Sequence, residues 1–106
     1  MYKFGDLLRG HTDMLILSIL DKEDSYGYMI NKKIEGLIKG EFSLSEATLY
    51  TSFKRLVKVG YLTSYWQNSE SGKKRKHYSI TLTGIIALNK QREEWELLTE
   101  VINEII

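Results

Sequence analysis

The chain has 106 residues, of which 42% are hydrophobic and 27% charged, a composition typical of one globular domain with a modest core. It has no cysteine, which excludes disulfides, thiolate nucleophiles and cysteine-based zinc sites. The formal net charge of +1 conceals a basic middle, because residues 43–80 carry seven Lys and Arg against two Glu, whereas residues 81–106 carry two against five.

The first helix is expected to begin at Thr12, a suitable N-cap, and to be apolar on most sides. Its longest apolar stretch, residues 14–20, is only seven residues long and cannot span a membrane, so we expect a cytoplasmic protein. Ser25 can cap a second helix, whose apolar residues recur at helical spacing. Tyr26 and Tyr28 are expected to anchor that second helix in the core.

A third helix is expected over residues 43–59. Ser43 and Glu46 fit the capping-box pattern, in which each side chain satisfies a free backbone donor of the other. Apolar residues recur from Leu49 at steps of three and four, and Gly60 ends the helix. The face away from the apolar residues carries hydroxyl and cationic side chains, which can meet a polyanion or simply face solvent.

After this helix the hydrophobic pattern changes to a period of two, which predicts strands over residues 62–67 and 76–80. The Ser-Gly pair between them indicates a turn, so the two strands are expected to form an antiparallel hairpin. Four consecutive cations lie near its tip: Lys73, Lys74, Arg75 and Lys76. Adjacent cations repel one another, so a phosphate backbone nearby would relieve a local cost; the alternative is a solvated loop.

Thr81 or Thr83 is expected to cap a long final helix that runs to Ile106. Its apolar residues recur every seven positions, with others three positions later, which is the a/d seam of a coiled coil over about three heptads. The seam consists of Leu88, Trp95, Leu98, Ile102 and Ile105. This seam is longer than three short helices can cover, so we expect it to join two copies of the chain.

Three helices followed by a two-stranded hairpin predict a mainly α (α+β) fold, the winged helix-turn-helix, in which the hairpin is the wing. Residues 1–80 would form the DNA-binding domain, and residues 81–106 a C-terminal dimerisation helix within the same structural unit. The third helix would enter the major groove of double-stranded DNA, and the wing would reach the adjacent backbone. The predicted DNA contacts are Ser45, Thr48, Tyr50, Thr51, Lys54, Arg55, Lys58, Lys73, Lys74, Arg75 and Lys76.

Several short motifs occur in a familiar order: Leu8-Arg9-Gly10, Ser25-Tyr26-Gly27-Tyr28, Ala47-Thr48-Leu49-Tyr50, Gly60-Tyr61-Leu62 and, in the hairpin, Arg75-Lys76. In these motifs the chain resembles the PadR family of bacterial transcriptional regulators. The resemblance implies a homodimeric winged-helix repressor of the small subclass with one C-terminal helix, some members of which bind planar aromatic or drug-like compounds between protomers. Thr51 departs from the family pattern, which usually has proline there, and this puts the operator preference in doubt.

An effector between two protomers would stack on Trp95, with Leu8 and Met14 lining the same space. The alternative is that Trp95 is an ordinary core or interface aromatic. No His–carboxylate pair and no glycine-rich phosphate loop is evident, so we expect no enzyme activity, cofactor or metal ion. Two rival functions stay open: a winged-helix protein–protein adaptor without operator-specific DNA binding, and a DNA-binding regulator without an effector.

Overall fold

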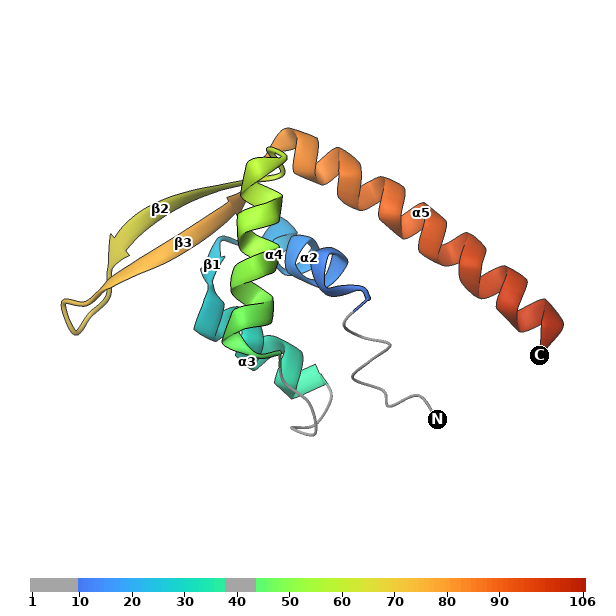
Figure 1. The fold of residues 1–106 in the computed structure, drawn as a ribbon, viewed down its shortest axis with the longest axis horizontal. Helices are drawn as coiled ribbons and strands as arrows, with labels where there is room; N and C mark the ends of the chain where they lie inside the picture. The colour runs from blue at the N-terminus through green and yellow to red at the C-terminus, as the bar shows by residue number, and fades with distance from the viewer. Residues whose placement is uncertain (1–9, 38–43) are drawn as a thin grey trace.

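The computed structural model of the protein describes residues 10–37 and 44–106. The elements in chain order are α2 (Thr12–Lys22), β1 (Ser25–Tyr26), α3 (Gly27–Leu37), α4 (Glu46–Lys58), β2 (Leu62–Asn68), β3 (Lys74–Ile80) and α5 (Leu82–Ile105). Helices α2, α3 and α4 lie together at the centre, the β2–β3 hairpin extends to one side and α5 to the other (Figure 1). The predicted winged helix-turn-helix with a long C-terminal helix is therefore confirmed.

The sheet has one strand more than predicted. Its three antiparallel strands lie in the order β1-β3-β2, and Ser25 and Tyr26 pair with Tyr78 and His77 of β3. The expectation that Ser25 caps the second helix was therefore wrong, because α3 begins at Gly27. A strand of two residues is too short to show a period, so the hydrophobic pattern could not predict it.

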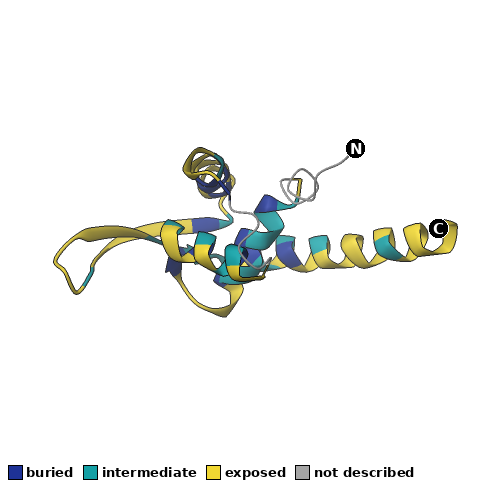
Figure 2. Cartoon of the chain, turned by 90° about the horizontal axis from the view of Figure 1, so that it is seen from below, coloured by how far each residue is buried: buried dark blue, intermediate teal, exposed yellow. Residues whose placement is uncertain are grey.

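One hydrophobic core supports the helices, the wing and the first half of α5. Phe53 of α4 stacks on Tyr78 of β3 with 4.1 Å between ring centroids, which joins the third helix to the base of the wing. The buried hydrophobic residues are Ile16, Leu17, Leu20, Ile30, Ile34, Leu44, Leu49, Phe53, Leu56, Leu62, Tyr78 and Leu88. The outer hairpin and the second half of α5 extend beyond this core and are exposed (Figure 2).

Helices α4 and α5 begin at side-chain caps. Ser45 accepts a hydrogen bond from the backbone N–H of Thr48 at 3.1 Å and so begins α4 two residues after the predicted cap, Ser43, which lies outside the described residues. Of the two predicted caps for α5, Thr81 is the N-cap, and its hydroxyl accepts from the backbone N–H of Gly84 at 3.0 Å. Helix α2 differs from the prediction, because its N-cap position is His11 and not Thr12.

Tyr28 lies on the surface and not in the core, with 64% of the residue exposed, so the expectation for this residue was wrong. Tyr26 belongs to β1 and is half-buried. Within the described residues no helix combines the length and the apolarity needed to cross a lipid bilayer.

The start of α5 is packed so closely that only glycine fits at position 84. A Cβ atom at Gly84 would lie 2.3 Å from the carbonyl oxygen of Tyr61 and 2.8 Å from Cγ1 of Ile80. We therefore expect Gly84→Ala to lower the free energy of unfolding by about 1–3 kcal/mol, measured by urea denaturation.

Gly36→Ala is the matched control for this substitution, because a Cβ at Gly36 in α3 meets nothing within 4 Å. This control is expected to be neutral or to stabilise by up to about 1 kcal/mol. Equal urea midpoints for the two variants would contradict the close packing of α5 on the turn that contains Tyr61.

Candidate nucleic-acid interface

The exposed surface of α4 divides into two flanks and a crest between them. Tyr50 lies on the flank that faces α3 and β3, where it lines a groove. Thr48 and Thr51 lie on the flank that faces α2 and α5, where they line a different and larger pocket. The crest between the two flanks carries Lys54 and Lys58, which are exposed and line neither cavity. The sequence placed these residues on one continuous face, whereas the structure separates them into three groups.

The cations of the wing lie on the hairpin and in its turn. Lys74, Arg75 and Lys76 belong to β3, and Lys73 lies in the turn. Lys76 pairs across the hairpin with Trp66, and its Nζ lies 6.0 Å from the centroid of the exposed indole ring. Since side chains alternate along a strand, Lys74, Lys76 and Trp66 share one face of the wing.

Most of these cations have no carboxylate partner among the residues that the structure describes. The ion pairs of the described residues join Lys33 to Glu23, Arg55 to Asp13 and Arg92 to Asp21. The lysines of the crest and the wing therefore form no ion pair with a described carboxylate: Lys54, Lys58, Lys73, Lys74 and Lys76. Two neighbouring elements thus present uncompensated positive charge, which attracts a polyanion.

Aromatic contacts hold the base of the wing against β1. The ring of His77 lies between those of Tyr26 and Tyr65, with centroid distances of 5.1 and 5.5 Å. Tyr65 donates a hydrogen bond of 2.7 Å to Asp24, and this bond, with a smaller contribution from burial, raises the pKa of Tyr65. Arg75 lies 4.7 Å from the centroid of the Tyr26 ring and donates to its hydroxyl at 3.2 Å.

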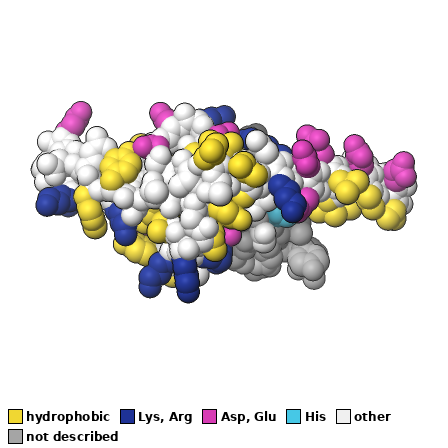
Figure 3. Space-filling view, turned by 90° about the horizontal axis from the view of Figure 1, so that it is seen from above, with side chains coloured by type: hydrophobic (Ala, Val, Ile, Leu, Met, Phe, Trp, Pro, Cys, Tyr) yellow, Lys and Arg dark blue, Asp and Glu magenta, His cyan; other side chains and the backbone are white. Residues whose placement is uncertain are grey.

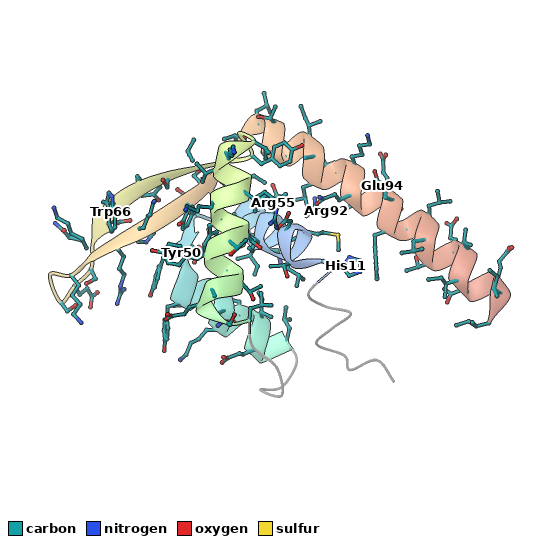
Figure 4. All side chains as sticks on the ribbon, viewed as in Figure 1. His11, Tyr50, Arg55, Trp66, Arg92 and Glu94 are labelled. Atoms are coloured by element: carbon teal, nitrogen blue, oxygen red, sulfur yellow. The ribbon has the colours of Figure 1, made fainter. Side chains whose placement is uncertain are left out.

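Arg55 forms an ion pair with a described carboxylate, unlike Lys54 and Lys58 on the same helix. Its Nε and Nη2 donate to the two carboxylate oxygens of Asp13 in α2 at 3.2 and 2.6 Å, and Nη2 also approaches Ser52 at 3.4 Å. The hydrogen bonds to Asp13, with the attraction between the charges, raise the pKa of Arg55. Tyr50 and Arg55 leave α4 on opposite sides (Figure 4). Arg55 therefore ties α4 to α2.

A pocket of about 620 Å³ lies between α2, α4 and α5. It brings together Trp95 and Met14, two of the three residues predicted to bind an effector, and the third, Leu8, lies outside the described residues. His11 meets the ring of Trp95 edge-on, with 5.1 Å between centroids. The volume lies within the range of about 300–1,000 Å³ that is usual for small-molecule sites.

The same pocket uses α4 as one of its walls, which the sequence did not predict. Thr48 and Thr51 line it, and the Thr51 hydroxyl donates at 2.8 Å to the carbonyl oxygen of Ala47. Gln91 and Glu94 of α5 also line it. Spacing along one helix could not show this, because the pocket forms only where α4 and α5 face each other. A ligand bound in this pocket would contact α4 directly.

The predicted seam on α5 divides into a buried and an exposed part. Leu88 is fully buried in the core of the chain and cannot contact a partner, so its assignment to a dimer interface was wrong. The rest of the seam is exposed: Trp95 by 42%, Leu98 by 45%, Ile102 by 43% and Ile105 by 79%. Hydrophobic side chains line one edge of the outer helix and acidic side chains the other (Figure 3).

A family model described as "Transcriptional regulator PadR-like family" matches residues 16–90, most of the chain. The protein belongs to the PadR-like family of transcriptional regulators. Members of this family regulate transcription by binding DNA and are not enzymes, so the expectation of no enzyme activity is confirmed. The matched part contains α4 and the wing but ends before Trp95, so it leaves out the exposed seam of α5.

Solved structures of PadR-like regulators share the fold. A transcriptional regulator from Clostridium thermocellum is 44% identical with a TM-score of 0.85, over 95% of this chain and 98% of that one. A PadR family regulator from Clostridium difficile is 37% identical with a TM-score of 0.78, over 90% and 97%. Among relatives matched by sequence alone, an uncharacterized protein from Lysinibacillus sphaericus is 38% identical, over 93% of this chain and 91% of that protein.

Proposed function

We propose that the protein is a cytoplasmic, homodimeric repressor that binds a specific operator. The uncompensated lysines on α4 and on the adjacent wing carry this proposal, because they lie on the two elements with which winged helices bind DNA. Helix α4 enters the major groove, and the wing binds the phosphate backbone. The proposed contacts are Ser45, Thr48, Tyr50, Thr51, Lys54, Lys58, Lys73, Lys74, Arg75 and Lys76. Arg55 is left out because Asp13 holds its guanidinium.

A second copy of the chain covers the exposed seam of α5. Four apolar residues at heptad spacing lie side by side on a helix that extends beyond its own core, and acidic residues occupy the other edge. Since the seam is self-complementary, two such helices can bury it by packing against each other. The dimer then presents two copies of α4 to half-sites about one helical turn, ~10 base pairs, apart.

A planar aromatic effector binds in the pocket between α2, α4 and α5 and relieves repression. Trp95, Met14 and Leu98 provide its apolar surfaces, and Thr48 and Thr51 of α4 lie on the opposite wall. An effector shifts the position of α4 only if it binds two arrangements of the protomers with different affinities. The pocket adjoins both the helix proposed to bind DNA and the helix proposed to form the dimer, and this supports such a coupling.

Fluorescence anisotropy tests operator binding. The protein is titrated at ~150 mM salt against a labelled duplex from upstream of its own gene and against a scrambled duplex. A preference of ~10³-fold or more is expected for a sequence-specific regulator. Weak and equal binding to both, which persists across duplexes tiling the neighbouring promoters, contradicts operator recognition. Absence of binding to any duplex favours the protein–protein adaptor.

Tryptophan fluorescence tests the effector. Trp66→Phe leaves Trp95 as the one tryptophan, since the chain has two. Saturable quenching by planar aromatic compounds is expected, with a loss of operator binding at the same concentrations. Trp95→Phe is the control, in which Trp66 should report no saturable quenching by the same compounds. A broad panel of planar aromatics without effect on either signal favours a regulator that has no effector.

A further inference from the structure

One buried polar atom in the proposed effector pocket has no hydrogen-bond partner. Gln91 of α5 lines the pocket between α2, α4 and α5. Its side-chain carbonyl oxygen, Oε1, is buried from solvent, and it is the one such side-chain atom without a partner in the part of the chain that the structure describes. A buried carbonyl oxygen without a donor costs free energy, and such atoms are rare in folded proteins. A ligand that brings a hydrogen-bond donor would relieve this cost.

Gln91 lies one helical turn before Trp95 on the same face of α5. Residues four positions apart on a helix are neighbours, with about 5–6 Å between their Cβ atoms. Leu98, three positions after Trp95, also lines the pocket, whereas Leu88, three positions before Gln91, is buried in the core. The α5 wall is therefore an apolar surface with an amide at the end nearer the core. A planar ring that stacks on Trp95 brings its edge beside this amide.

The charges of the lining disfavour an anionic ligand. Besides His11, the charged groups that line the pocket are one cation, Arg55, and two carboxylates, Asp13 and Glu94. Asp13 compensates Arg55 through two hydrogen bonds, and Glu94 forms no ion pair with another described residue. An aromatic carboxylate would therefore add a second negative charge to an uncompensated one. A neutral ligand avoids this repulsion.

Gln91 also interrupts the apolar seam of α5, which offers a structural explanation for its amide. A buried amide in a coiled coil can fix the register by bonding to the partner helix. The surroundings of Gln91 favour a ligand instead, because the other walls of its pocket are α2 and α4 of the same chain. The terminal amide torsion of glutamine is soft, so Oε1 can turn toward a ligand without movement of the helix.

We propose that Gln91 selects effectors that carry an N–H group on the edge of a neutral planar ring system. The ring stacks on Trp95, and the N–H donates to Oε1 of Gln91. A ring of the same shape without the N–H leaves Oε1 unpaired and binds more weakly. This inference rests on the proposed effector pocket, and it adds the chemical class of the effector and the residue that recognises it.

Two pairs of compounds with matched shapes test this selection. Acridone has an N–H where xanthone has a ring oxygen, and carbazole differs from dibenzofuran in the same way. Equilibrium dialysis against the purified protein measures the Kd of each compound. The N–H compound of each pair is expected to bind about tenfold more tightly than its oxygen analogue. Equal affinities within both pairs would overturn the selection by Gln91 and leave the effector pocket standing. Binding of none of the four compounds would overturn both.

Gln91→Met removes the acceptor and keeps the length of the side chain. In this variant the preference for the N–H compounds should fall below about twofold. Its urea midpoint should equal or exceed that of the wild type, because the substitution removes an unpaired buried oxygen. Gln67→Met is the matched control, since Gln67 lies on β2 outside this pocket, and it should keep the full preference.

Two results for Gln91→Met would contradict ligand recognition. An unchanged preference with a lower urea midpoint would show that the amide supports the fold of the single chain. An unchanged preference with a changed mass in sedimentation equilibrium would show that the amide fixes the register of two α5 helices.

Discussion

The double substitution Leu98→Glu and Ile102→Glu is expected to convert the proposed dimer into a monomer of about 12.4 kDa. Both side chains are nearly half exposed in one protomer, so the change removes little from its own core. In a symmetric pair of α5 helices it would place like charges against one another and remove apolar area from the seam. Because each protomer would then hold one half-site alone, operator affinity should fall by about 10²–10⁴-fold.

Sedimentation equilibrium measures the mass, and anisotropy measures the affinity. Leu82→Glu and Ile86→Glu together form the matched control, since both are exposed apolar residues of the same helix outside the seam. This control should stay dimeric and bind the operator as the wild type does. A dimeric Leu98→Glu, Ile102→Glu protein with an unchanged circular dichroism spectrum would show that the two copies meet elsewhere.

Replacement of Lys73, Lys74 and Lys76 by alanine should weaken binding to every duplex by a similar factor. These three lysines make no ion pair with a described carboxylate, so their charge is free to bind phosphates. Arg75 is retained because it also donates a hydrogen bond to the hydroxyl of Tyr26. The slope of log K against log salt should fall by about 0.9 for each phosphate that the wing no longer binds, and the ratio of operator to scrambled affinity should change little.

Lys22→Ala and Lys90→Ala serve as the control for the wing, because they remove positive charge from surfaces not assigned to DNA. Their salt slope should match that of the wild type. An unchanged slope in the wing variant would mean that the hairpin does not touch DNA, and a change in sequence preference alone would mean that it contacts bases.

The elements with a clear hydrophobic period could be predicted from the sequence. Helix α4, the hairpin and α5 follow periods of 3.6, two and seven over enough residues for each pattern to repeat. Strand β1 could not be predicted in this way, since its pairing with β3 depends on residues about fifty positions later. Tyr28 lies two positions before Ile30 and six before Ile34, the buried residues of α3, and so falls on the opposite face of the helix. Helical spacing therefore agrees with its exposure, and the expectation that it anchors the core did not follow from that spacing.

Two site residues illustrate what spacing cannot resolve. Leu88 continues the heptad pattern of Trp95 and Ile102, but it packs inside its own protomer, and a seam has the same period whichever chain covers it. Arg55 lies on the polar side of α4, but its partner Asp13 is 42 positions earlier in the chain. The fold alone brings that pair together, and with it the pocket that α4 and α5 share.

Because α5 is one uninterrupted helix, the proposed dimer would be sensitive to small changes in the angle at which its two α5 helices cross. A helix of 24 residues is about 36 Å long. A change of ~5° in the angle at which two such helices cross would displace the far ends by about 3 Å, close to the ~3.4 Å rise of one base pair. Conservative substitutions in the seam that keep the dimer but alter this angle should therefore select operators with a different number of base pairs between half-sites. Spacer length and half-site sequence would then be set by different parts of the chain and could change independently.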